Sequence, residues 1–445
     1  MKRVLYIFLL ASALTALFSS CGKDDFGIPD DPTPRTRPEE RSDENIGRDA
    51  LILYSAGFNN LASSLDQDIQ ELASGYVPTD SFYEDGIFII SRSSQKKGYS
   101  VSVPTYIIRM YTDMDGKVQL DTLHALPDAI AASSLTMNTA LNYIKDNFGA
   151  DRYGMIFSSH ASGWLPPGYF TSSTFIDLGS GPRMAPMAAS QAGQYSWPVF
   201  PGPLTKSIGQ DEVKYPTTLP KPFEMPLEQF TEAIPMHMDY IIFDACLMGG
   251  VEVAYSLKDK VDLIAFSPAE ILSTGFDYTK LGERVFKGDS PDIKGACQDY
   301  FDYYKDKSGD EGSATVSIAI SSHMQELADV CKKLIEAHAS DLEHVDPFKV
   351  QRYYRHNSHW FFDLEDYFLK AGISSSEADV LHNALSKAVI TSYETTWHTD
   401  SFMPTYGGFR INHYSGLSTF IPMGEAKYTN AYRDTKWNKA VGLVK

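Results

Sequence analysis

The stretch "MDYIIFDACLMGG" (residues 238–250) indicates the fold of this chain, because it is an apolar strand with reactive side chains at its end. Its apolar run is continuous rather than alternating, which is typical of a strand in a parallel sheet that is covered on both faces. In such sheets, reacting groups gather beyond the carboxyl ends of the strands. The strand is predicted over 239–246, so that Asp244 and Cys246 point to one face about 7 Å apart.

A nucleophilic role for Cys246 is one interpretation of this strand end. A helix predicted directly after Cys246 would favour its thiolate form, and a thiolate needs a proton acceptor and oxyanion donors nearby. A second apolar strand, "YGMIFSSH" (153–160), ends at His160. His323 also follows a strand pattern, but it precedes a helix whose Ser322 and Gln325 form a capping-box pattern. The alternatives are a buried structural thiol at 246 and a hydrogen-bonded loop histidine at 160.

Strands and helices are predicted to alternate along the rest of the chain. The predicted strands are 51–57, 86–94, 105–112, 153–160, 239–246, 261–267 and 315–322, and the predicted helices are 61–74, 128–148, 226–233, 251–259 and 324–338. Asp115-Gly116 predicts a hairpin turn after the third strand. The alternation predicts an α/β fold with a mainly parallel central sheet and helices on both faces.

The first 48 residues have the composition of an export signal and a tether. Lys2 and Arg3 precede an apolar run that is shorter than the roughly 20 residues of a membrane span and has the layout of a signal peptide. "LFSSC" resembles the lipobox of bacterial lipoproteins, with Cys21 as the acylated residue, and "KDD" after it resembles the surface-export signal of Bacteroidetes lipoproteins. We therefore expect a signal peptide over 1–20, a disordered tether over 21–48 and an outer-membrane lipoprotein exposed on the cell surface. The alternative is an ordinary signal peptide with an incidental cysteine.

The folded part is expected to consist of a core over 49–290 and a C-terminal extension over 291–445 that packs on it. An insert over 165–225, rich in Pro, Gly and Ser, interrupts the core and is predicted to be a long exposed excursion. Cys297 and Cys331 have apolar helical neighbours and are predicted to lie in the interior.

Composition and motifs exclude several classes of function. The net charge of −18 lacks the basic surplus that nucleic-acid phosphates require. The sequence has no GxSxG, HExxH, paired CxxC or phosphate-binding glycine loop. "TDMDGK" (112–117) is better explained as a hairpin turn than as a calcium loop, so no metal site and no cofactor are predicted.

Two motifs carry a resemblance to a known family. "HASGW" (160–164) and "FDACLM" (243–248), each at a strand end and in this order, resemble the clostripain family of cysteine peptidases. Softer matches are "YSAGFNNL" (54–61), "SPAEILSTGFDY" (267–278) and "SGLSTFIP" (415–422). The resemblance covers roughly residues 50–425 and implies the caspase-like α/β/α sandwich that gingipains and legumains share.

The resemblance also implies roles for individual residues. His160 and Cys246 would form the catalytic dyad, and the backbone N–H groups of Ala161 and Cys246 would form the oxyanion site. Asp244 would bind an Arg or Lys side chain before the cleaved bond, as a buried carboxylate matches a guanidinium; the alternative is an ion pair or cap with the neighbouring loop. Asn59 or Asn60 would orient the histidine, although either fits a turn-forming role equally well.

The expected function is therefore a surface-anchored endopeptidase acting on proteins or peptides with a basic residue before the cleaved bond. Family members often cut themselves between the histidine and the cysteine, which makes Arg183, Lys206, Lys214 and Lys221 candidate self-cleavage sites. Some relatives are assisted by calcium, and nothing in this sequence localises such a site. The alternatives are a catalytically silent binding lipoprotein and a hydrolase of non-peptide amides. The silent form is favoured by Ala161, where the clan usually has Gly, and by the long insert between His160 and Cys246, which are 86 positions apart.

Overall fold

The structure is a computed structural model that describes residues 48–79, 85–93, 103–127, 129–167, 208–213, 221–355, 360–392, 395–422 and 426–445. Within these ranges no helix is both long and apolar enough to cross a membrane. The signal peptide, the tether and Cys21 lie outside the described residues.

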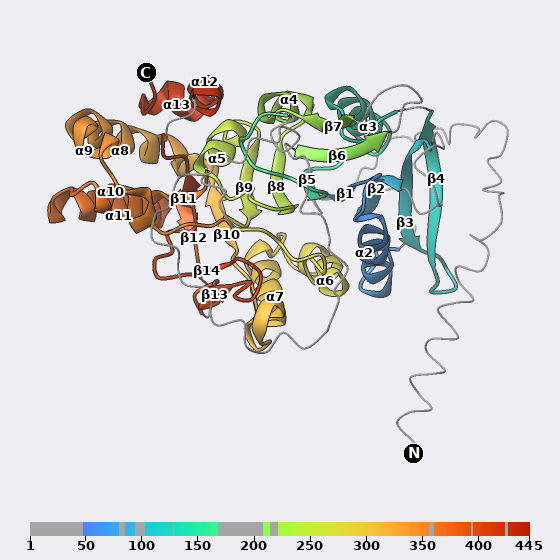
Figure 1. Ribbon diagram of the computed structural model, residues 1–445. Coiled ribbons are helices and arrows are strands. Elements are labelled where there is room, and N and C mark those ends of the chain that lie inside the picture. The colour runs from blue at the N-terminus through green and yellow to red at the C-terminus, as the bar shows by residue number, and fades with distance from the viewer. Residues whose placement is uncertain are drawn as a thin grey trace, which may run out of the picture. The chain divides into compact units, whose positions relative to one another are not determined.

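A nine-stranded sheet forms the centre of the molecule, with the strand order β12-β10-β9-β8-β5-β1-β2-β3-β4 (Figure 1). The five central strands, β9 to β2 in this order, are parallel, and antiparallel strands close both edges. The sheet strands are β1 (Asp49–Gly57), β2 (Gly86–Ser93), β3 (Thr105–Thr112), β4 (Val118–Leu126), β5 (Arg152–Ser158), β8 (Met238–Asp244), β9 (Val261–Phe266), β10 (Ser317–Ile320) and β12 (Val389–Ile390). The predicted mainly parallel sheet is confirmed.

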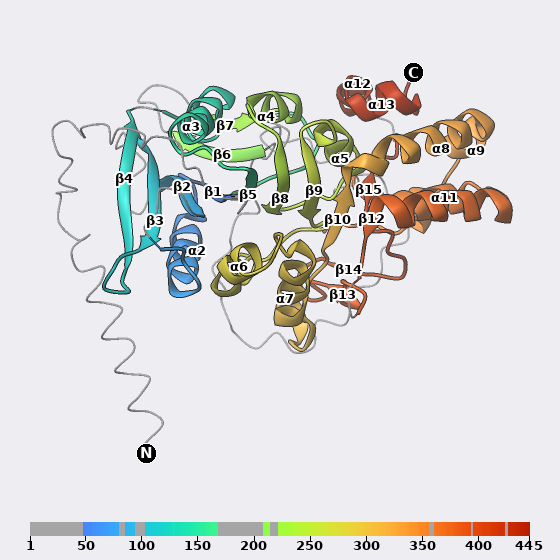
Figure 2. The same cartoon turned by 180° about the vertical axis from the view of Figure 1, so that it is seen from behind.

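Helices cover both faces of this sheet, as Figures 1 and 2 show. Leu51 and Leu53 of β1 face the cluster that includes α2, α6 and α7, whereas Ile52 and Tyr54 face the cluster that includes α3, α4 and α5. These helices are α2 (Ala62–Ser74), α3 (Ser134–Asn147), α4 (Leu227–Ala233), α5 (Val251–Leu257), α6 (Tyr278–Phe286) and α7 (Ile293–Lys305). Each buried aliphatic side chain stabilises the fold by about 1.5–3 kcal/mol. A strand that is apolar on both faces gains this stabilisation fully only when a helix layer covers each face of the sheet.

Close packing between β5 and β8 explains one glycine of the central sheet. Gly154 lies opposite Tyr240 of β8, whose ring covers it. A β-carbon at position 154 would lie 1.9 Å from that ring. The absence of a side chain at 154 therefore lets a large aromatic residue pack beside the strand that leads to His160.

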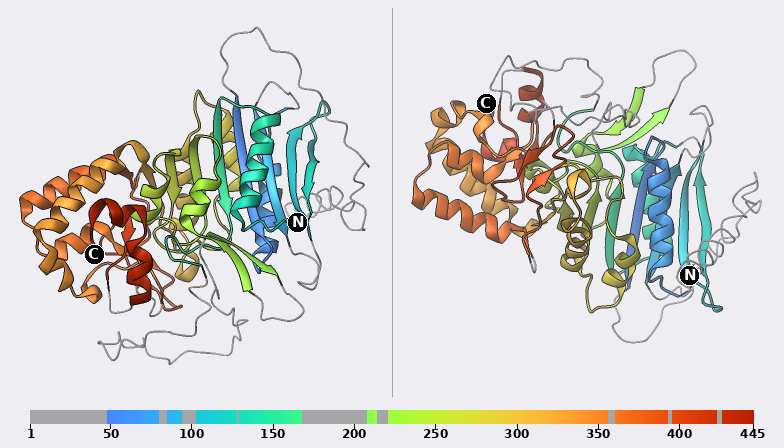
Figure 3. Two further views of the ribbon diagram at one scale, coloured as in Figure 1. Left: turned by 90° about the horizontal axis from the view of Figure 1, so that it is seen from above. Right: turned by 60° about the horizontal axis from the view of Figure 1, so that its bottom comes forward.

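The C-terminal region is more than an extension packed on the core, because it supplies two strands of the sheet. β10 pairs with β9, and β12 pairs with β10, both antiparallel. The C-terminal helices gather beyond this edge (Figure 3). They are α8 (Met324–Ala337), α9 (Ala339–Glu343), α10 (Leu364–Lys370), α11 (Ser375–Ala388), α12 (Ala426–Arg433) and α13 (Lys436–Val441), with 3₁₀ turns η2 (Gly309–Glu311), η3 (Ser321–His323) and η4 (Pro347–Lys349).

Three two-stranded sheets complete the described structure. They pair β6 (Ile208–Val213) with β7 (Lys221–Met225), β11 (Phe362–Asp363) with β15 (Ser418–Thr419), and β13 (Ser401–Phe402) with β14 (Phe409–Arg410). The first pair lies within the insert of 165–225. Ile208 to Asp211 of β6 are buried, so this part of the insert is not the exposed excursion that its composition predicts.

One predicted helix start and one predicted helix cap are wrong. The helix predicted from 128 begins at Ser134, after a loop in which Ala131 accepts a hydrogen bond from Tyr54. The Ser322–Gln325 cap does not form, because residues 321–323 make a 3₁₀ turn and His323 itself precedes α8. Cys297 and Cys331 are buried in α7 and α8, as predicted.

Candidate active site

His160 and Cys246 follow the ends of two strands that lie side by side. β5 and β8 are parallel, and their register pairs Ser158 with Asp244. His160 is two residues beyond Ser158, and Cys246 is two residues beyond Asp244. The same edge of the sheet therefore carries both side chains, although 86 positions separate them in the sequence.

Cys246 lies in a turn rather than on the strand. β8 ends at Asp244, and the following loop (245–250, the cysteine loop) turns at Leu247, which has a φ of 62° and donates its N–H to Ala269. The prediction that Asp244 and Cys246 share one strand face is therefore wrong. The helix predicted over 251–259 is present as α5, which begins at Val251, so it does not follow Cys246 directly. The Cys246 side chain is partly exposed, and its Sγ lies 3.6 Å from the Ile271 carbonyl oxygen.

The structure separates the two candidate asparagines. Oδ1 of Asn60 lies 2.6 Å from Nε2 of His160. Asn59 is buried and bonds to the backbone instead: its Nδ2 donates to Ala56 and Gln210, and its Oδ1 accepts from Leu61. Asn60 therefore contacts the histidine, whereas Asn59 shapes the turn after β1.

Asp244 is covered by the loop that precedes α6. The residue is 8% exposed, and its carboxylate accepts hydrogen bonds from the Tyr278 hydroxyl at 2.8 Å and from the Phe276 backbone. Gly275 has a φ of 64° and approaches so closely that a β-carbon there would lie 2.3 Å from Asp244 Oδ2. Asp244 thus serves as a cap for the neighbouring loop in this structure, which was the alternative to substrate binding.

A second carboxylate, Asp68 of α2, belongs to the same buried cluster. Burial raises the pKa of Asp68, and the nearby charge of Asp244 raises it further. Burial also raises the pKa of Asp244, although its bonds from Tyr278 and Phe276 oppose the shift. Ser158, at the end of β5, hydrogen-bonds to Asp68 and so connects this strand end to α2. No motif in the sequence points to Asp68, which lies on an amphipathic helix.

The segment 415–422 is fastened to the cysteine loop. Ser418 donates its N–H to Gly249 at 2.8 Å, and Glu252 of α5 accepts hydrogen bonds from Thr419 Oγ1 at 3.0 Å and from the Phe420 N–H at 3.2 Å. Burial raises the pKa of Glu252 to about 7. This carboxylate therefore joins the helix behind the cysteine loop to the C-terminal region.

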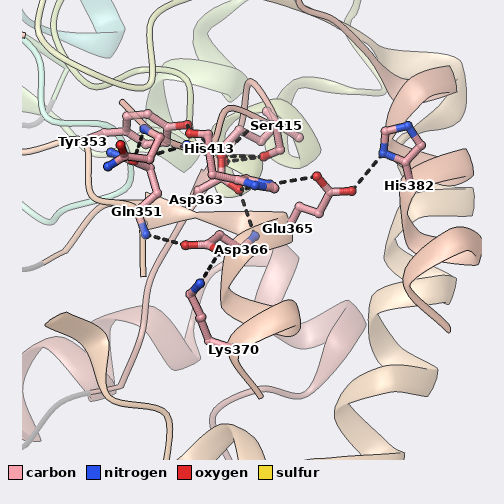
Figure 4. A network of polar contacts seen from close by, with 11 residues as sticks. Gln351, Tyr353, Asp363, Glu365, Asp366, Lys370, His382, His413 and Ser415 are labelled. Atoms are coloured by element: carbon pink, nitrogen blue, oxygen red, sulfur yellow. Dashed lines mark hydrogen bonds and ion pairs between the residues drawn. The ribbon is translucent and has the colours of Figure 1, made fainter. Parts of the chain in front are cut away.

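A polar network holds the start of this segment (Figure 4). Asp363 accepts hydrogen bonds from the N–H and hydroxyl of Ser415 and from the Tyr353 hydroxyl. Glu365 lies 2.9 Å from Nε2 of His413 and raises the pKa of that imidazole. The network fixes residues 413–415 just ahead of the strand that contacts Gly249.

The loop after β5 (159–165, the histidine loop) packs on the same segment. The Trp164 ring lies edge-on to Phe420 and to Tyr432, each at 5.0 Å between ring centroids. Phe420 also contacts Glu252 through its N–H. The C-terminal region thus contacts both the histidine loop and the cysteine loop.

Ala161 forms an isolated antiparallel bridge with Ile208 of β6. The hydrogen bond of this bridge runs from the Gly209 N–H to the His160 carbonyl, so the Ala161 N–H is not its donor. Arg183, Lys206 and Lys214 lie outside the described residues, and of Lys221 only its backbone position at the start of β7 is described. In the described ranges, no group of three or more His, Cys, Asp or Glu side chains is arranged to hold a metal ion.

A sequence profile of the clostripain family matches residues 197–440, more than half of the chain and including Cys246. The chain belongs to the clostripain family of cysteine peptidases. Clostripain from Hathewaya histolytica is 22% identical to it over 91% of this chain and 82% of its own length. The resemblance found in the sequence is thereby confirmed.

Solved structures of clostripain-family (C11) proteases share the fold. An inactive zymogen from Parabacteroides distasonis is 22% identical, covers 89% of this chain and 99% of its own, and superposes with a TM-score of 0.68. A secreted cysteine protease from Bacteroides thetaiotaomicron, solved with an irreversible peptide inhibitor, is 21% identical over 89% of this chain and 99% of its own, with a TM-score of 0.67. The predicted caspase-like α/β/α fold is confirmed by this likeness.

Proposed function

We propose that this clostripain-family protein is a surface-anchored cysteine endopeptidase that cleaves after Arg or Lys, with Cys246 as nucleophile and His160 as general base and acid. The observation that carries the proposal is the register of β5 and β8, which brings both residues to one sheet edge. Cys246 is partly exposed, which is consistent with its role as the attacking residue. The peptide inhibitor bound by the Bacteroides relative favours a peptide substrate.

The reaction follows from these groups. Asn60 Oδ1 accepts a hydrogen bond from Nε2–H of His160, which leaves the lone pair on Nδ1 to take the thiol proton. The sulfur attacks the carbonyl carbon while the N–H groups of Ala161 and Cys246 stabilise the oxyanion. The C–N bond then breaks as His160 protonates the leaving amine, and a thioester remains. Water attacks the thioester, gives a proton to His160 and releases the carboxylic acid, which restores the thiol.

Asp244 is the proposed determinant of basic specificity. Its carboxylate directly precedes the cysteine loop, and a guanidinium would match it. Access requires the Gly275–Tyr278 loop to move, because that loop covers the carboxylate. We expect Asp244→Asn to lower kcat/KM for Arg and Lys substrates by more than for Asn substrates, as a panel of Arg, Lys, Asn and Asp peptide amides would measure.

Surface anchoring and maturation complete the proposal. The "LFSSC" and "KDD" motifs favour acylation at Cys21 and export to the cell surface. A cut after Arg183, Lys206, Lys214 or Lys221 would be the matching self-cleavage. Radiolabelled fatty acid incorporation, compared between wild type and Cys21→Ala, tests the anchor. N-terminal sequencing of any second fragment locates the cut.

The test of the activity is labelling with an arginyl acyloxymethyl ketone. The wild type should be labelled at Cys246, Cys246→Ala should not be labelled, and the matched control Cys297→Ala should be labelled as the wild type is. Equal labelling of wild type and Cys246→Ala would refute the assignment. A correctly folded wild type without labelling or amide hydrolysis would favour the second candidate, a silent binding protein, which the covered Asp244 and Ala161 favour.

A further inference from the structure

The first strand after the undescribed part of the insert is bonded to the histidine loop. In β6, the Gly209 N–H donates to the His160 carbonyl at 3.0 Å, and the Gln210 N–H donates to Ser159 Oγ at 3.2 Å. The Gln210 carbonyl accepts from Asn59 Nδ2 at 2.7 Å. β6 therefore contacts the His160 backbone, the side chain of the preceding Ser159 and the turn after β1.

A buried ion pair fixes β6 in this place. Arg92 Nη1 of β2 lies 2.8 Å from Asp211 Oδ2, and the two side chains are 5% and 0% exposed. Arg92 also donates from Nε to the Val103 carbonyl at 2.9 Å, and its guanidinium stacks on the Phe58 ring at 4.2 Å. A buried ion pair with these additional contacts resists separation, since either charge left alone in the interior is strongly unfavourable.

The histidine loop depends on these contacts because it lies beyond the sheet. β5 ends at Ser158, so Ser159 and His160 no longer belong to the ladder of the sheet. Ser159 Oγ donates to the Ala56 carbonyl at 2.7 Å and Asn60 contacts the His160 ring, while the bonds to Ser159 Oγ and to the His160 carbonyl come from β6. A shift of β6 would therefore move His160 relative to Cys246.

We propose that Asp211 and Arg92 are positioning residues of the peptidase, which hold His160 in its reactive place through β6. This inference rests on the proposed function. The end of the insert is thus a part of the active-site support. A self-cleavage that matures the enzyme must therefore not remove residues 208–211. A cut after Lys206 or after Lys214 meets that condition, because these residues flank β6 in the sequence.

The test compares Asp211→Asn with a matched control. Asp49→Asn breaks another Arg–Asp pair, with Arg152 at 2.8 Å, at the opposite ends of β1 and β5. A misplaced reacting group typically costs up to about 100-fold in rate, so Asp211→Asn should lower kcat by about 10- to 100-fold and change KM by less than about threefold. Alkylation of Cys246 by iodoacetamide should also slow in Asp211→Asn, because a displaced His160 no longer takes the thiol proton, whereas Asp49→Asn should be alkylated within about threefold of the wild-type rate. Asp49→Asn should leave kcat within about threefold of wild type.

A double variant distinguishes positioning from simple destabilisation. Arg92→Gln combined with Asp211→Asn replaces the ion pair by a neutral amide pair and should recover at least about threefold of the kcat that Asp211→Asn loses. If Asp211→Asn does not fold, Arg92→Lys replaces it as the single variant. It keeps the charge but changes the contact geometry, and it is expected to lower kcat and leave KM as stated for Asp211→Asn.

The inference is overturned if folded Asp211→Asn has the kcat of the wild type, or if the double variant is no better than the single one. It is also overturned if Asp49→Asn loses as much kcat as Asp211→Asn, since the effect would then be general. Failure of the peptidase assignment looks different: the wild type itself would be inactive and unlabelled at Cys246, and this inference would fall with it.

Discussion

Oδ1 of Asn60 lies 2.6 Å from Nε2 of His160, whereas its neighbour Asn59 turns inward and bonds to backbone atoms of three other residues. Two adjacent asparagines therefore have different roles: Asn60 contacts the histidine, and Asn59 stabilises the turn after β1. The exposure of Asn60 and the burial of Asn59 agree with this division.

Substitution of the two asparagines should separate activity from stability. Asn60→Ala should lower kcat by about 10-fold or more, as removal of an orienting partner does, with a change in the free energy of unfolding within about 0.5 kcal/mol. Asn59→Ala should lower the free energy of unfolding by about 1–3 kcal/mol, because buried groups lose their partners. Peptide-amide hydrolysis and urea unfolding measure the two effects. An equal loss of kcat per folded molecule in both variants would contradict the assignment of Asn60 to activity and Asn59 to stability.

Gly275→Ala should disturb the loop over Asp244. The new β-carbon would lie 2.3 Å from Asp244 Oδ2 at a φ of 64°, so we expect a loss of about 1–3 kcal/mol in the free energy of unfolding and a lower kcat/KM for Arg substrates. Gly116→Ala is the control, because its φ is 75° but the space around it is open. It should cost about 1 kcal/mol and leave kcat/KM unchanged. Identical kinetics in the two variants would argue against a role for this loop in substrate binding.

The stability of the protein should depend on the ionisation of Glu252. Burial raises the pKa of Glu252 from 4.5 to about 7, so the folded state binds the proton more tightly than the unfolded state. The resulting stabilisation is fully present below pH 4.5 and is lost as the pH rises through 7. Between pH 4.5 and 8, the free energy of unfolding of the wild type should fall by about 3 kcal/mol relative to that of Glu252→Gln, in which position 252 does not titrate.

Urea unfolding of both proteins at these two pH values measures the difference directly. Groups such as Asp244 and Asp68, whose pKa values are also raised by burial, are present in both proteins and cancel in the comparison. A constant difference in stability across the range would show that Glu252 does not titrate there.

Thiol reactivity should distinguish Cys246 from the two interior cysteines. Burial raises the pKa of both Cys297 and Cys331, which lie in α7 and α8 with no exposed surface. A disulfide reagent at neutral pH should therefore react with Cys246 in the native protein, and with Cys297 and Cys331 only after unfolding. Mass spectrometry of the modified peptides identifies the sites. Rapid native modification of Cys297 would show that its helix opens readily.

The central strands were predictable from sequence because their apolar runs are long and continuous. β3 matches its predicted bounds, 105–112. Strand ends were harder to predict, since tertiary hydrogen bonds set them. The cysteine loop leaves the sheet after Asp244 because Ala269 and Ser267, from the next strand's end, accept hydrogen bonds from Leu247 and Gly249. An apolar pattern carries no information about such partners.

The site was predictable only for residues that finish a strand. His160 and Cys246 stand out because reactive side chains follow apolar runs, and parallel strands bring such ends together. Asp211 and Glu252 were missed because their partners lie 119 and 168 positions away, at Arg92 and Phe420. A single acidic residue without a local partner looks like an ordinary surface charge in a sequence.

The side-by-side pairing of β5 and β8 has a consequence for a nicked molecule. The backbone bonds between these strands do not depend on the peptide chain that joins them, so a break anywhere between residues 168 and 207 leaves both halves in one sheet. Such a protein would elute as a single species in gel filtration and divide into two bands only when denatured. An unchanged elution volume would therefore not distinguish the intact chain from the cleaved one.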